Sequence, residues 1–433
     1  MATQASAALS PNRLKKESSI FNQPLPVWVV FFASVFAFMG MGLVNPILRE
    51  LSEKLHASPS EVSLLFTSYN AVMACAMLLT AKVSSKLGIK GTLMAGVCII
   101  AIVSFFGGHA GSIWTLVGLR AGWGLGNALF VATALTAFVS LSSSGSAKAI
   151  ILYEAAAGIG MSIGPLLGGT LGSISWKMPF FVVSSLMLIT CIGLAVSMPR
   201  AKVKNAAASA GAGADASFST GAGPNAGTKP KPKASLLDPF RALKQHHSLL
   251  VLGIVAALYN IGFFTIMAFA PFVMGLKPRG MGYVFLGWGI LLAITSVFIA
   301  PILQKKFGTL KSLVCMLFLF VVDLAIMGMF TSTREVVIVA VIIAGAIIGN
   351  SNTLITTAVM NAAPVERSTA SAAYSFLRFL GAAISPYMAG KLSEIFNAHV
   401  PFIVGAAFVL LSIVYMWANS KHIRHIDRAP ASH

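Results

Sequence analysis

Residues 160–169 read GMSIGPLLGG, and this short stretch is the strongest indication of how the chain folds. It places four glycines and a proline within one apolar segment. These residues remove side-chain bulk from one stripe of a helix and bend its axis, which lets a neighbouring backbone approach closely. The pattern predicts a membrane helix whose packing can seal one end of a cavity; generic small-residue packing is the alternative. The residues concerned are Gly160, Gly164, Pro165, Gly168 and Gly169.

The composition indicates that most of the chain is surrounded by lipid. Of 433 residues, 57% are apolar before the 39 glycines are counted, and 10% are charged. Ordinary globular proteins have roughly 45–50% apolar residues with glycine included and about 25% charged residues. The chain therefore has too little polar surface to cover a water-soluble fold of its size.

Twelve apolar stretches are long enough to cross a hydrocarbon core of about 30 Å, which needs some 20 residues. They form two sets of six, separated by an Ala/Gly/Ser-rich and KPKPK-containing segment that predicts a flexible linker. At its end, DPFRALK at 238–244 predicts a short amphipathic helix. The expected spans are 27–47, 61–81, 91–108, 113–139, 149–172, 178–198, 248–272, 281–303, 311–331, 336–360, 369–390 and 401–419.

The sequence thus predicts an all-α polytopic membrane protein with twelve transmembrane helices in two six-helix bundles. The expected parts are an N-terminal tail (1–26), the first bundle (27–198), the linker (199–247), the second bundle (248–419) and a C-terminal tail (420–433).

The positive charge of the chain is distributed as an orientation signal. The formal net charge is +19, from 31 Lys and Arg against 12 Asp and Glu, which in a soluble protein would suggest a nucleic-acid partner. Here 22 of the 31 basic residues lie in the tails, the linker and the loops on their side, and 7 lie in the opposite loops. The positive-inside rule therefore places both termini in the cytoplasm, with the protein in the inner (plasma) membrane and no nucleic-acid partner.

Features of the first six spans recur in the second six in the same order. Each set has an even number of spans, so the two sets share one topology and are related by an axis along the membrane normal. Such an arrangement suits two bundles that rock about a central site. The corresponding pairs, offset by 220 or 221 residues, are Gly88 and Gly308, Tyr153 and Tyr374, Gly160 and Gly381, and Pro165 and Pro386.

With these motifs the chain resembles the major facilitator superfamily, and within it the twelve-helix drug:proton antiporters. Residues 160–169 are similar to the family signature GxxxGPxxGG, and RAGWGLGNA at 120–128 is similar to RxxQGxGxA, with Trp123 where glutamine is usual. The resemblance implies proton-coupled export and a part for Arg120 in proton transfer. A buried arginine costs at least about 2.5–3.5 kcal/mol unless it meets water or an acceptor, so it should face the bundle interior. A structural anchor is the alternative role.

The loop between the second and third spans departs from the family pattern. It reads AKVSSKLGIKG at 81–91, where the family has GxLaDrxGrrx, so Ser85 replaces an aspartate that is thought to lock the cytoplasmic gate. Lys305 stands at the same place in the second-half copy. The resemblance implies gating roles for Gly88 and Lys86 and a lock that is weaker or built otherwise. The positive-inside rule alone also accounts for the loop lysines.

Two acidic residues, Glu154 and Asp323, lie well inside predicted spans, where an ionisable group is by default a functional candidate. Glu154, roughly 8 Å inside the cytoplasmic end of its span, is our candidate proton carrier, with Arg120 as its electrostatic regulator. The alternative is a carboxylate that reaches cytoplasmic water or pairs with Lys148. Asp323 is a second proton-coupling candidate, although its depth of about 18 Å, against about 15 Å for Arg378, favours a structural ion pair.

Polar and aromatic side chains on several spans predict an adaptable pocket for lipophilic compounds. Asn70 ends a row with Ser63 and Thr67 on one helical face, and Asn350 begins a similar row. Core packing is the alternative for each of them. The candidate substrate-binding residues are Phe38, Tyr69, Asn70, Trp123, Asn127, Tyr259, Asn260, Phe263 and Asn350.

Enzyme and metal motifs are not found. The chain has no HExxH and no phosphate-binding GK[ST] loop. The string GMSIG at 160–164 matches GxSxG by letter but lies within a predicted membrane span instead of a strand-to-helix turn, so we expect no enzymatic activity. The cysteines lie in apolar runs without metal-ligand spacing and are expected to be buried, inert thiols. KHIRHIDR at 421–428 could hold a metal through its histidines, but a lipid-facing or disordered tail is favoured. We therefore expect no metal and no cofactor beyond a proton gradient.

Together these features predict a monomeric secondary transporter that exports hydrophobic or amphipathic small molecules in exchange for protons by alternating access. Related alternatives are a proton-coupled transporter of a single metabolite, such as a sugar or siderophore-like compound, and a lipid translocator. A membrane sensor is disfavoured because the sequence has no appended cytoplasmic domain.

Overall fold

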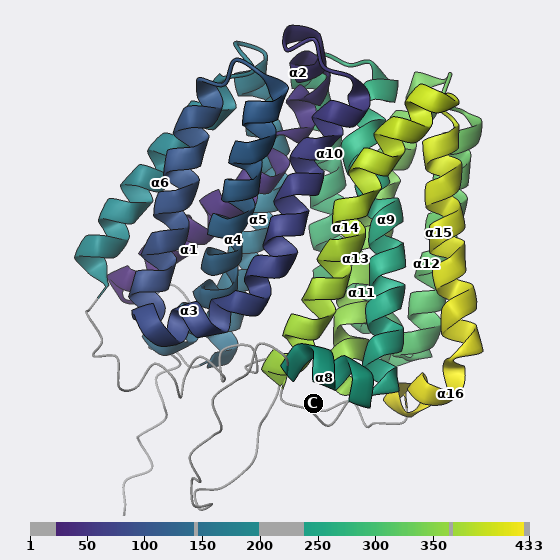
Figure 1. Cartoon of the computed structure of the whole chain (residues 1–433). Helices are drawn as coiled ribbons and strands as arrows, with labels where there is room; N and C mark the ends of the chain where they lie inside the picture. The colour runs from purple at the N-terminus through teal and green to yellow at the C-terminus, as the bar shows by residue number, and fades with distance from the viewer. Residues whose placement is uncertain (1–22, 143–145, 199–237, 363–366, 428–433) are drawn as a thin grey trace, which may run out of the picture.

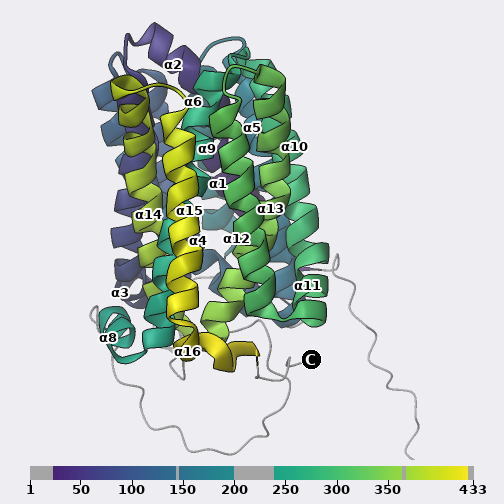
Figure 2. The same cartoon turned by 90° about the vertical axis from the view of Figure 1, so that its right-hand side faces the viewer.

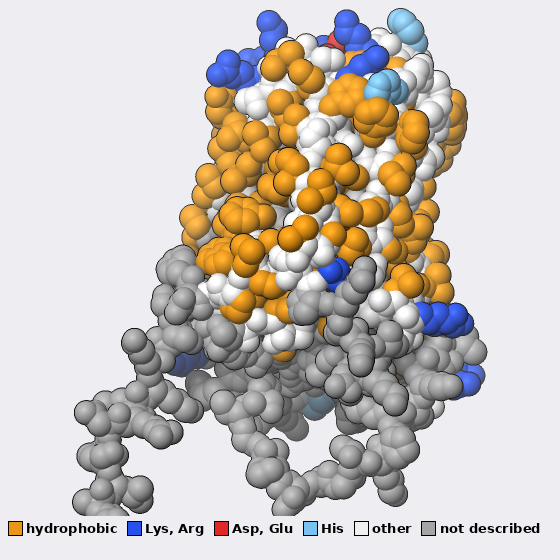
Figure 3. Space-filling view, turned by 90° about the vertical axis from the view of Figure 1, so that its left-hand side faces the viewer, with side chains coloured by type: hydrophobic (Ala, Val, Ile, Leu, Met, Phe, Trp, Pro, Cys, Tyr) orange, Lys and Arg blue, Asp and Glu red, His pale blue; other side chains and the backbone are white. Residues whose placement is uncertain are grey.

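The computed structural model describes residues 23–142, 146–198, 238–362 and 367–427. Within these ranges the chain is built from helices that run side by side, with no β-strand (Figure 1). Apolar side chains cover the flank of the molecule, whereas lysines and arginines gather at its two ends (Figure 3). This surface fits a protein that crosses a bilayer. Most of the predicted N-terminal tail and linker lies outside the described residues.

The first half of the chain forms one bundle. Pro46 lacks an amide hydrogen and cannot continue a regular helix. The first predicted span is therefore interrupted after α1 (Leu25–Gly42) by the short helix η1 (Asn45–Ile47), which α2 (Leu48–Lys54) follows. The remaining helices are α3 (Pro59–Gly108), α4 (Ile113–Leu141), α5 (Ser146–Gly172) and α6 (Met178–Ser197).

The second half forms the other bundle. The segment expected to be amphipathic is the helix α8 (Asp238–Gln245), which buries Pro239, Ala242 and Leu243 against α9 and α14. The helices that follow are α9 (His247–Met274), α10 (Pro278–Ile294), the π-helix η3 (Thr295–Ile299), α11 (Ala300–Phe307), α12 (Thr309–Met329), α13 (Arg334–Ala362), α14 (Arg367–Ile395), α15 (Val400–Ala418), α16 (Ser420–Ile423) and η4 (Arg424–Asp427).

The two ends of the bundles are distinguished below by what they carry. The linker side carries Ser197 at the end of α6, the helix α8 and the C-terminal η4. It is the lower end in Figures 1 and 2. The distal side carries α2 and is the upper end.

A single glycine makes the turn where a loop was expected between the second and third spans. The helix α3 runs for 50 residues through both spans and changes direction at Gly88, whose φ is 71° and ψ 172°. Gly308 adopts nearly the same conformation, with φ 87° and ψ 165°, between α11 and α12. Residues with a side chain rarely adopt a positive φ. The predicted correspondence of Gly88 with Gly308 is thus confirmed by their geometry.

All twelve predicted spans are helical in the structure. Eleven segments of the described residues are long and apolar enough to cross a membrane. The other predicted span lies within α14, whose 29 residues extend over about 43 Å but are less apolar. Since α14 packs between α3 and α9, its polar residues can face protein instead of lipid.

Each half of the chain has its own hydrophobic core. One cluster of buried side chains extends from Val27 to Met198 and includes Ala268, and the other extends from Ala242 to Ile426. Two pairs of long helices connect the bundles, α5 with α10 and α3 with α14. The same helices also pack within their own bundles, α5 on α1 and α14 on α9. The internal repeat thus places equivalent helices at equivalent contacts.

The glycines of α5 bring its backbone against that of α1. A Cβ atom at Gly160 would lie 2.5 Å from the Val35 carbonyl oxygen, and one at Gly164 would lie 2.6 Å from the Met39 carbonyl oxygen. Neither neighbour is a flexible side chain that could move aside. Gly381 makes the equivalent approach to the Ala257 backbone, as the repeat predicts. By contrast, Gly158 has no such neighbour within 4 Å.

We expect Gly164→Ala to destabilise the first bundle by about 1–3 kcal/mol, because the added methyl group must push α5 away from α1. Thermal unfolding of the purified protein in detergent would show this as a lower Tm. Gly158→Ala is the matched control on the same helix, where space is free and alanine favours the helix over glycine. Equal melting temperatures for the two variants would contradict this account of the glycine stripe.

Candidate functional site

A second face of α5 forms the contact between the bundles. A Cβ atom at Gly289 of α10 would lie 2.9 Å from the Cα of Ser162, and one at Gly282 would lie 2.8 Å from the Pro165 carbonyl oxygen. A Cβ atom at Gly169 would likewise come too close to the Pro278 carbonyl oxygen of the other bundle. The stretch 160–169 therefore packs its own bundle on one face and the opposite bundle on another. All these positions lie in the distal half of α5.

The contact between α3 and α14 also lies toward the distal side. The Asn70 side chain donates a 3.4 Å hydrogen bond to the Ala382 carbonyl oxygen. Closer to the distal end, a Cβ at Gly390 would lie 2.4 Å from Ser60, so the two backbones touch there. The Asn45 side-chain amide donates a 3.4 Å hydrogen bond to the Met267 sulfur, which connects η1 to α9. Together these contacts close the distal side of the interface.

The N-terminus of α3 is capped from both bundles. Ser58 and Glu61 form a local capping box, with the Glu61 carboxylate accepting from Ser58 N at 2.8 Å. The next free amide, Ser60 N, donates to Glu394 Oε1 of α14 at 2.9 Å. Lys391 holds the other carboxylate oxygen at 2.9 Å. An anion at this position also meets the positive end of the α3 dipole, so Glu394 fastens the two bundles.

The pKa of Glu394 reflects these contacts. Partial burial raises it, but the hydrogen bonds from Lys391 and from Ser60 lower it further, to about 2. Because this pKa is below the ordinary value, the carboxylate stabilises the contact fully above the ordinary pKa of about 4.5, and this stabilisation is lost as pH falls through about 2. The contact is therefore insensitive to pH in the physiological range.

Glu154 lies on the side of α5 away from that helix's exposed apolar residues. At 100° per residue it falls between the Gly160 face, which meets α1, and the Ser162 face, which meets α10. The exposed apolar residues Ile159 and Ile163 lie on the opposite side. Glu154 itself is exposed, and open space surrounds Gly158 one turn away. The carboxyl group thus lies on the linker side of the contact between the bundles.

Arg120 lies in a different part of the first bundle, within an aromatic and amide cluster. Its guanidinium carbon is 4.8 Å from the ring centre of Tyr69 and 4.7 Å from that of Trp123. Asn127 donates a 2.6 Å hydrogen bond to the Tyr69 hydroxyl. Arg120 is 1% exposed, and its Nε and one terminal nitrogen have no hydrogen-bond partner. Cation–π contacts therefore account for much of its stabilisation.

The structure does not bring Arg120 and Glu154 together. Arg120 lies about 10 Å from the distal start of α4, whereas Glu154 lies about 12 Å from the linker-side start of α5. In helices about 40 Å long, this leaves roughly 20 Å between them along the bundle. Direct electrostatic control of Glu154 by Arg120, expected from the sequence, therefore lacks support in this geometry. Lys148, the alternative partner, has a side chain outside the described set.

The second bundle has a polar cluster of its own. Arg378 donates a 3.4 Å hydrogen bond to the side-chain oxygen of Asn352, and the Tyr259 hydroxyl donates to the same oxygen at 3.3 Å. Asp323 is not part of it, which corrects the expected ion pair with Arg378. Asp323 is 6% exposed on α12, which packs on α13 and α15, and its Oδ2 has no hydrogen-bond partner. Asp323 and Arg378 lie at similar depths in the membrane, but on helices that do not bring their side chains together.

Most predicted substrate-binding residues are buried inside their bundles in this conformation. Phe38 packs on Tyr153 at a ring distance of 5.8 Å, and Asn260 and Asn350 donate to carbonyls of their own helices. Phe263 is partly exposed and stacks on Trp288, with ring centres 6.0 Å apart. The fully or nearly buried members of the predicted set are Phe38, Tyr69, Asn70, Trp123, Asn127, Tyr259, Asn260 and Asn350.

The turns at Gly88 and Gly308 both lack the aspartate of the family pattern. They differ in which groups lie there instead. In the first, Ser85 Oγ donates to the Lys82 carbonyl of its own helix, and Lys86 is exposed. In the second, the docked C-terminal segment supplies a carboxylate to the turn at Gly308. Asp427 Oδ1 accepts from the backbone amides of Thr309 at 2.8 Å and Leu310 at 3.1 Å.

This docking corrects the expectation of a lipid-facing or disordered C-terminal tail for residues 420–427. Ile423 and Ile426 are buried, and the His425 ring lies 3.1 Å from the Ala362 carbonyl. His422 stacks on His247. The two candidate metal ligands, His422 and His425, therefore contact different neighbours.

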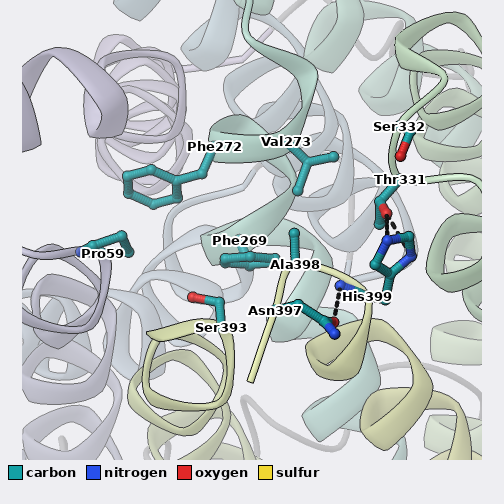
Figure 4. Close-up of a pocket in the computed structure, with 10 residues that line it drawn as sticks. All are labelled: Pro59, Phe269, Phe272, Val273, Thr331, Ser332, Ser393, Asn397, Ala398 and His399. Atoms are coloured by element: carbon teal, nitrogen blue, oxygen red, sulfur yellow. Dashed lines mark hydrogen bonds between the residues drawn. The ribbon is translucent and has the colours of Figure 1, made fainter. Parts of the chain in front are cut away.

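A surface pocket of about 540 Å³ lies on the distal side, remote from Glu154 (Figure 4). Phe269, Phe272 and Val273 from the end of α9 form its apolar wall. His399 closes one side, where its ring lies 2.7 Å from the Thr331 hydroxyl. Pro59 of α3 and Ser393 of α14 also line it, so the pocket lies beside the distal contact between the bundles, at the opposite end from Glu154.

Comparisons with known proteins agree with this architecture. The family model described as the Major Facilitator Superfamily matches residues 30–386 and 252–431. The chain is 46% identical over 414 residues to the multidrug efflux protein YfmO of Bacillus subtilis (strain 168), covering 96% of this chain and 98% of the relative. It is 27% identical over 168 residues to the quinolone resistance protein NorA of Staphylococcus aureus (strain MRSA252), covering 38% of this chain and 43% of that protein.

Solved structures share the fold at low identity. A bacterial homologue of the human lysosomal transporter Spinster, in an inward-facing and unoccupied conformation, superposes with a TM-score of 0.73 at 15% identity. The match covers 94% of this chain and 98% of that one.

We expect Glu394→Ala to loosen the distal contact without unfolding either bundle. Hydrogen bonds to charged groups contribute about 1.5–3 kcal/mol, so amide exchange at the start of α3, around Ser60, should become at least about tenfold faster. Hydrogen–deuterium exchange with mass spectrometry measures this. The effect should be the same at pH 6 and pH 8, because the pKa of Glu394 is about 2. Glu335→Ala, at an exposed distal acid, is the control; similar exchange in both variants would refute the role of Glu394.

Proposed function

Because this chain belongs to the Major Facilitator Superfamily, we propose that it exports hydrophobic or amphipathic small molecules, drugs among them, in exchange for protons by alternating access. The observation that carries this proposal is the 46% identity, over almost the whole length of both chains, to a protein named for multidrug efflux. The family shows a membrane transporter; the proton coupling, the direction and the substrate class are the proposal.

The proposed orientation puts the linker side in the cytoplasm of the cell and the distal side outside, in the plasma membrane. The excess of basic residues in the tails, linker and neighbouring loops supports it. In this orientation the contacts of Gly169, Asn70 and Glu394 close the outer side. The structure then corresponds to a state that receives substrate from the cytoplasm or the inner leaflet.

We infer that Glu154 carries the coupling proton. An acid inside a membrane protein is stable when neutral or in contact with water. Glu154 is exposed on the linker side of the contact between the bundles, so opening and closing of this side would alternate the two conditions. Asp323 is the weaker candidate, because α12 packs on α13 and α15 away from the contact between the bundles. Any part of Arg120 in proton transfer would have to run through water, given its distance from Glu154.

The proposed substrate class follows from the side chains near the junction of the bundles. Phe66 and Phe264 face one another across it, with ring centres 6.5 Å apart, and Phe263 and Trp288 lie beside them. Aromatic rings bind apolar compounds without requiring a fixed hydrogen-bond pattern. Glu154 adds one negative group, which favours lipophilic cations. We propose that the protein works as a monomer. Besides the substrate, this mechanism needs the proton gradient and the surrounding bilayer.

Transport in proteoliposomes tests the proposal. With an imposed pH gradient we expect uphill movement of a lipophilic cationic dye such as ethidium, and none when an ionophore collapses the gradient. Unchanged flux without a gradient would refute proton coupling. Competition by chemically unrelated lipophilic compounds is expected, whereas inhibition by one metabolite alone would favour the single-substrate alternative.

Glu154→Gln should reduce gradient-driven accumulation of the dye at least about tenfold, because the amide cannot release a proton. Exchange of labelled for unlabelled dye across the membrane should persist, because this step needs no net proton movement. Glu335→Gln, at an exposed distal acid, is the control and should transport normally. Full gradient-driven transport by a folded Glu154→Gln variant would move the proton site elsewhere.

A further inference from the structure

The thiols of Cys98 in α3 and Cys191 in α6 lie 3.0 Å apart, sulfur to sulfur. The chain has two other cysteines, both exposed: Cys75, in the part of α3 before the turn at Gly88, and Cys315, in α12. No motif or spacing in the sequence pairs any of the four. The expectation that they are buried is wrong, because Cys75 and Cys315 are exposed and Cys98 and Cys191 are partly exposed.

Three hydrogen bonds, donated by two side chains, hold α3 and α6 in register on either side of this pair. On the linker side, Lys90 Nζ donates to the carbonyl oxygens of Ala195 at 2.7 Å and Met198 at 2.6 Å. Toward the distal side, Ser184 Oγ donates to the Ala101 carbonyl oxygen at 2.8 Å. The helices run in opposite directions, so Cys98 and Cys191 fall between these hydrogen bonds and stay opposite each other.

The pair lies within the membrane-crossing region and close to lipid. Cys98 is about 15 Å from Gly88, and Cys191 about 9 Å from the end of α6 at Ser197. Both cysteines are partly exposed. Their neighbours Ile102 and Ile192 are 56% and 58% exposed on the flank of the bundle. Molecules dissolved in the bilayer can therefore reach the thiols more readily than water-soluble reductants can.

We propose that Cys98 and Cys191 form a modification site, a dithiol that lipid-soluble quinones oxidise to an intramembrane disulfide. Both S–H bonds break and one S–S bond forms. The two electrons and two protons pass to the quinone, which leaves as the hydroquinone. The sulfurs need to approach by only about 1 Å to reach the 2.05 Å of a disulfide. A bridging soft metal ion, with metal–sulfur bonds near 2.3 Å, would instead require them to separate.

The disulfide would join two helices of one bundle and would not cross the contact between the bundles. It should therefore leave transport intact while fixing α3 to α6. This inference does not depend on the proposed export function, and its readout is the number of free thiols. Loss of transport in some variant and failure of the thiols to pair are accordingly separate results.

Thiol counting in the full-length protein tests the site. The protein in lipid vesicles is treated with a lipid-soluble benzoquinone, the quinone is removed, and the denatured chain is labelled with a maleimide of defined mass. Free thiols should fall from four to two, and dithiothreitol should restore four. Peptide mapping should find Cys98 joined to Cys191. Four remaining thiols, quinone adducts that dithiothreitol does not reverse, or a different pairing would overturn the proposal.

Matched variants separate this pair from the other thiols. In Cys98→Ser, all three remaining thiols should stay free after oxidation. In a Cys75→Ser, Cys315→Ser double variant, both remaining thiols should be lost. Size-exclusion profiles establish that each variant is folded. Loss of thiols in Cys98→Ser to the same extent as in the unmodified chain would show that another cysteine reacts, and would overturn the assignment.

Discussion

The close approach of α5 to two neighbouring backbones determines how the first bundle packs and how it meets the second. Glycines at 160 and 164 let α5 touch α1 within the bundle, and Gly169 lets it touch α10 in the other bundle. A side chain at any of these positions would meet a backbone atom, which cannot rotate away. One helix thus fixes both the shape of the first bundle and its distance from the second. In the repeat, α14 does the same between α9 and α3.

The two kinds of contact differ in how easily they can be broken. Within each bundle, α5 and α14 lie against continuous hydrophobic cores that remain assembled. Between the bundles, the distal side is held by close glycine contacts, such as Gly390 with Ser60, and by a few hydrogen bonds, such as Glu394 with Ser60 and Asn70 with Ala382. Water can replace a neutral hydrogen bond at a net cost of about 1 kcal/mol and one to a charged group at about 1.5–3 kcal/mol. The interface is therefore suited to opening while the bundles stay intact.

The sequence predicted the helices and the repeat because both depend on local or periodic features. The apolar stretches gave the twelve segments, and the glycines at 88 and 308 identified two equivalent turns. The residue pairs that cross the structure were not predictable in this way. Glu394 and Ser60 are 334 residues apart, and Asp427 reaches Thr309 from a segment with the composition of a free tail.

The errors in the candidate site have a common physical cause. Counting residues from a helix end gives depth in the membrane but not which helices are neighbours. Asp323 and Arg378 were therefore paired wrongly, and Arg120 was assigned to Glu154 without regard to their opposite depths. The sequence also carries no signal for Asn352, which contacts Arg378 and Tyr259. This contact depends on the packing of α9, α13 and α14.

Rocking of the two bundles about the α5 and α14 contacts can be followed by pulsed electron paramagnetic resonance, which measures the distance between two spin labels. In a transporting chain without native cysteines, one spin-label pair would be attached through Ser173→Cys and Glu335→Cys on the distal side, and another through Lys86→Cys and Lys421→Cys on the linker side. All four positions are exposed. Adding substrate and changing pH should lengthen the distal distance and shorten the linker-side distance together. Unchanged distances at both ends, or change at only one end, in a protein that still exports would contradict the account.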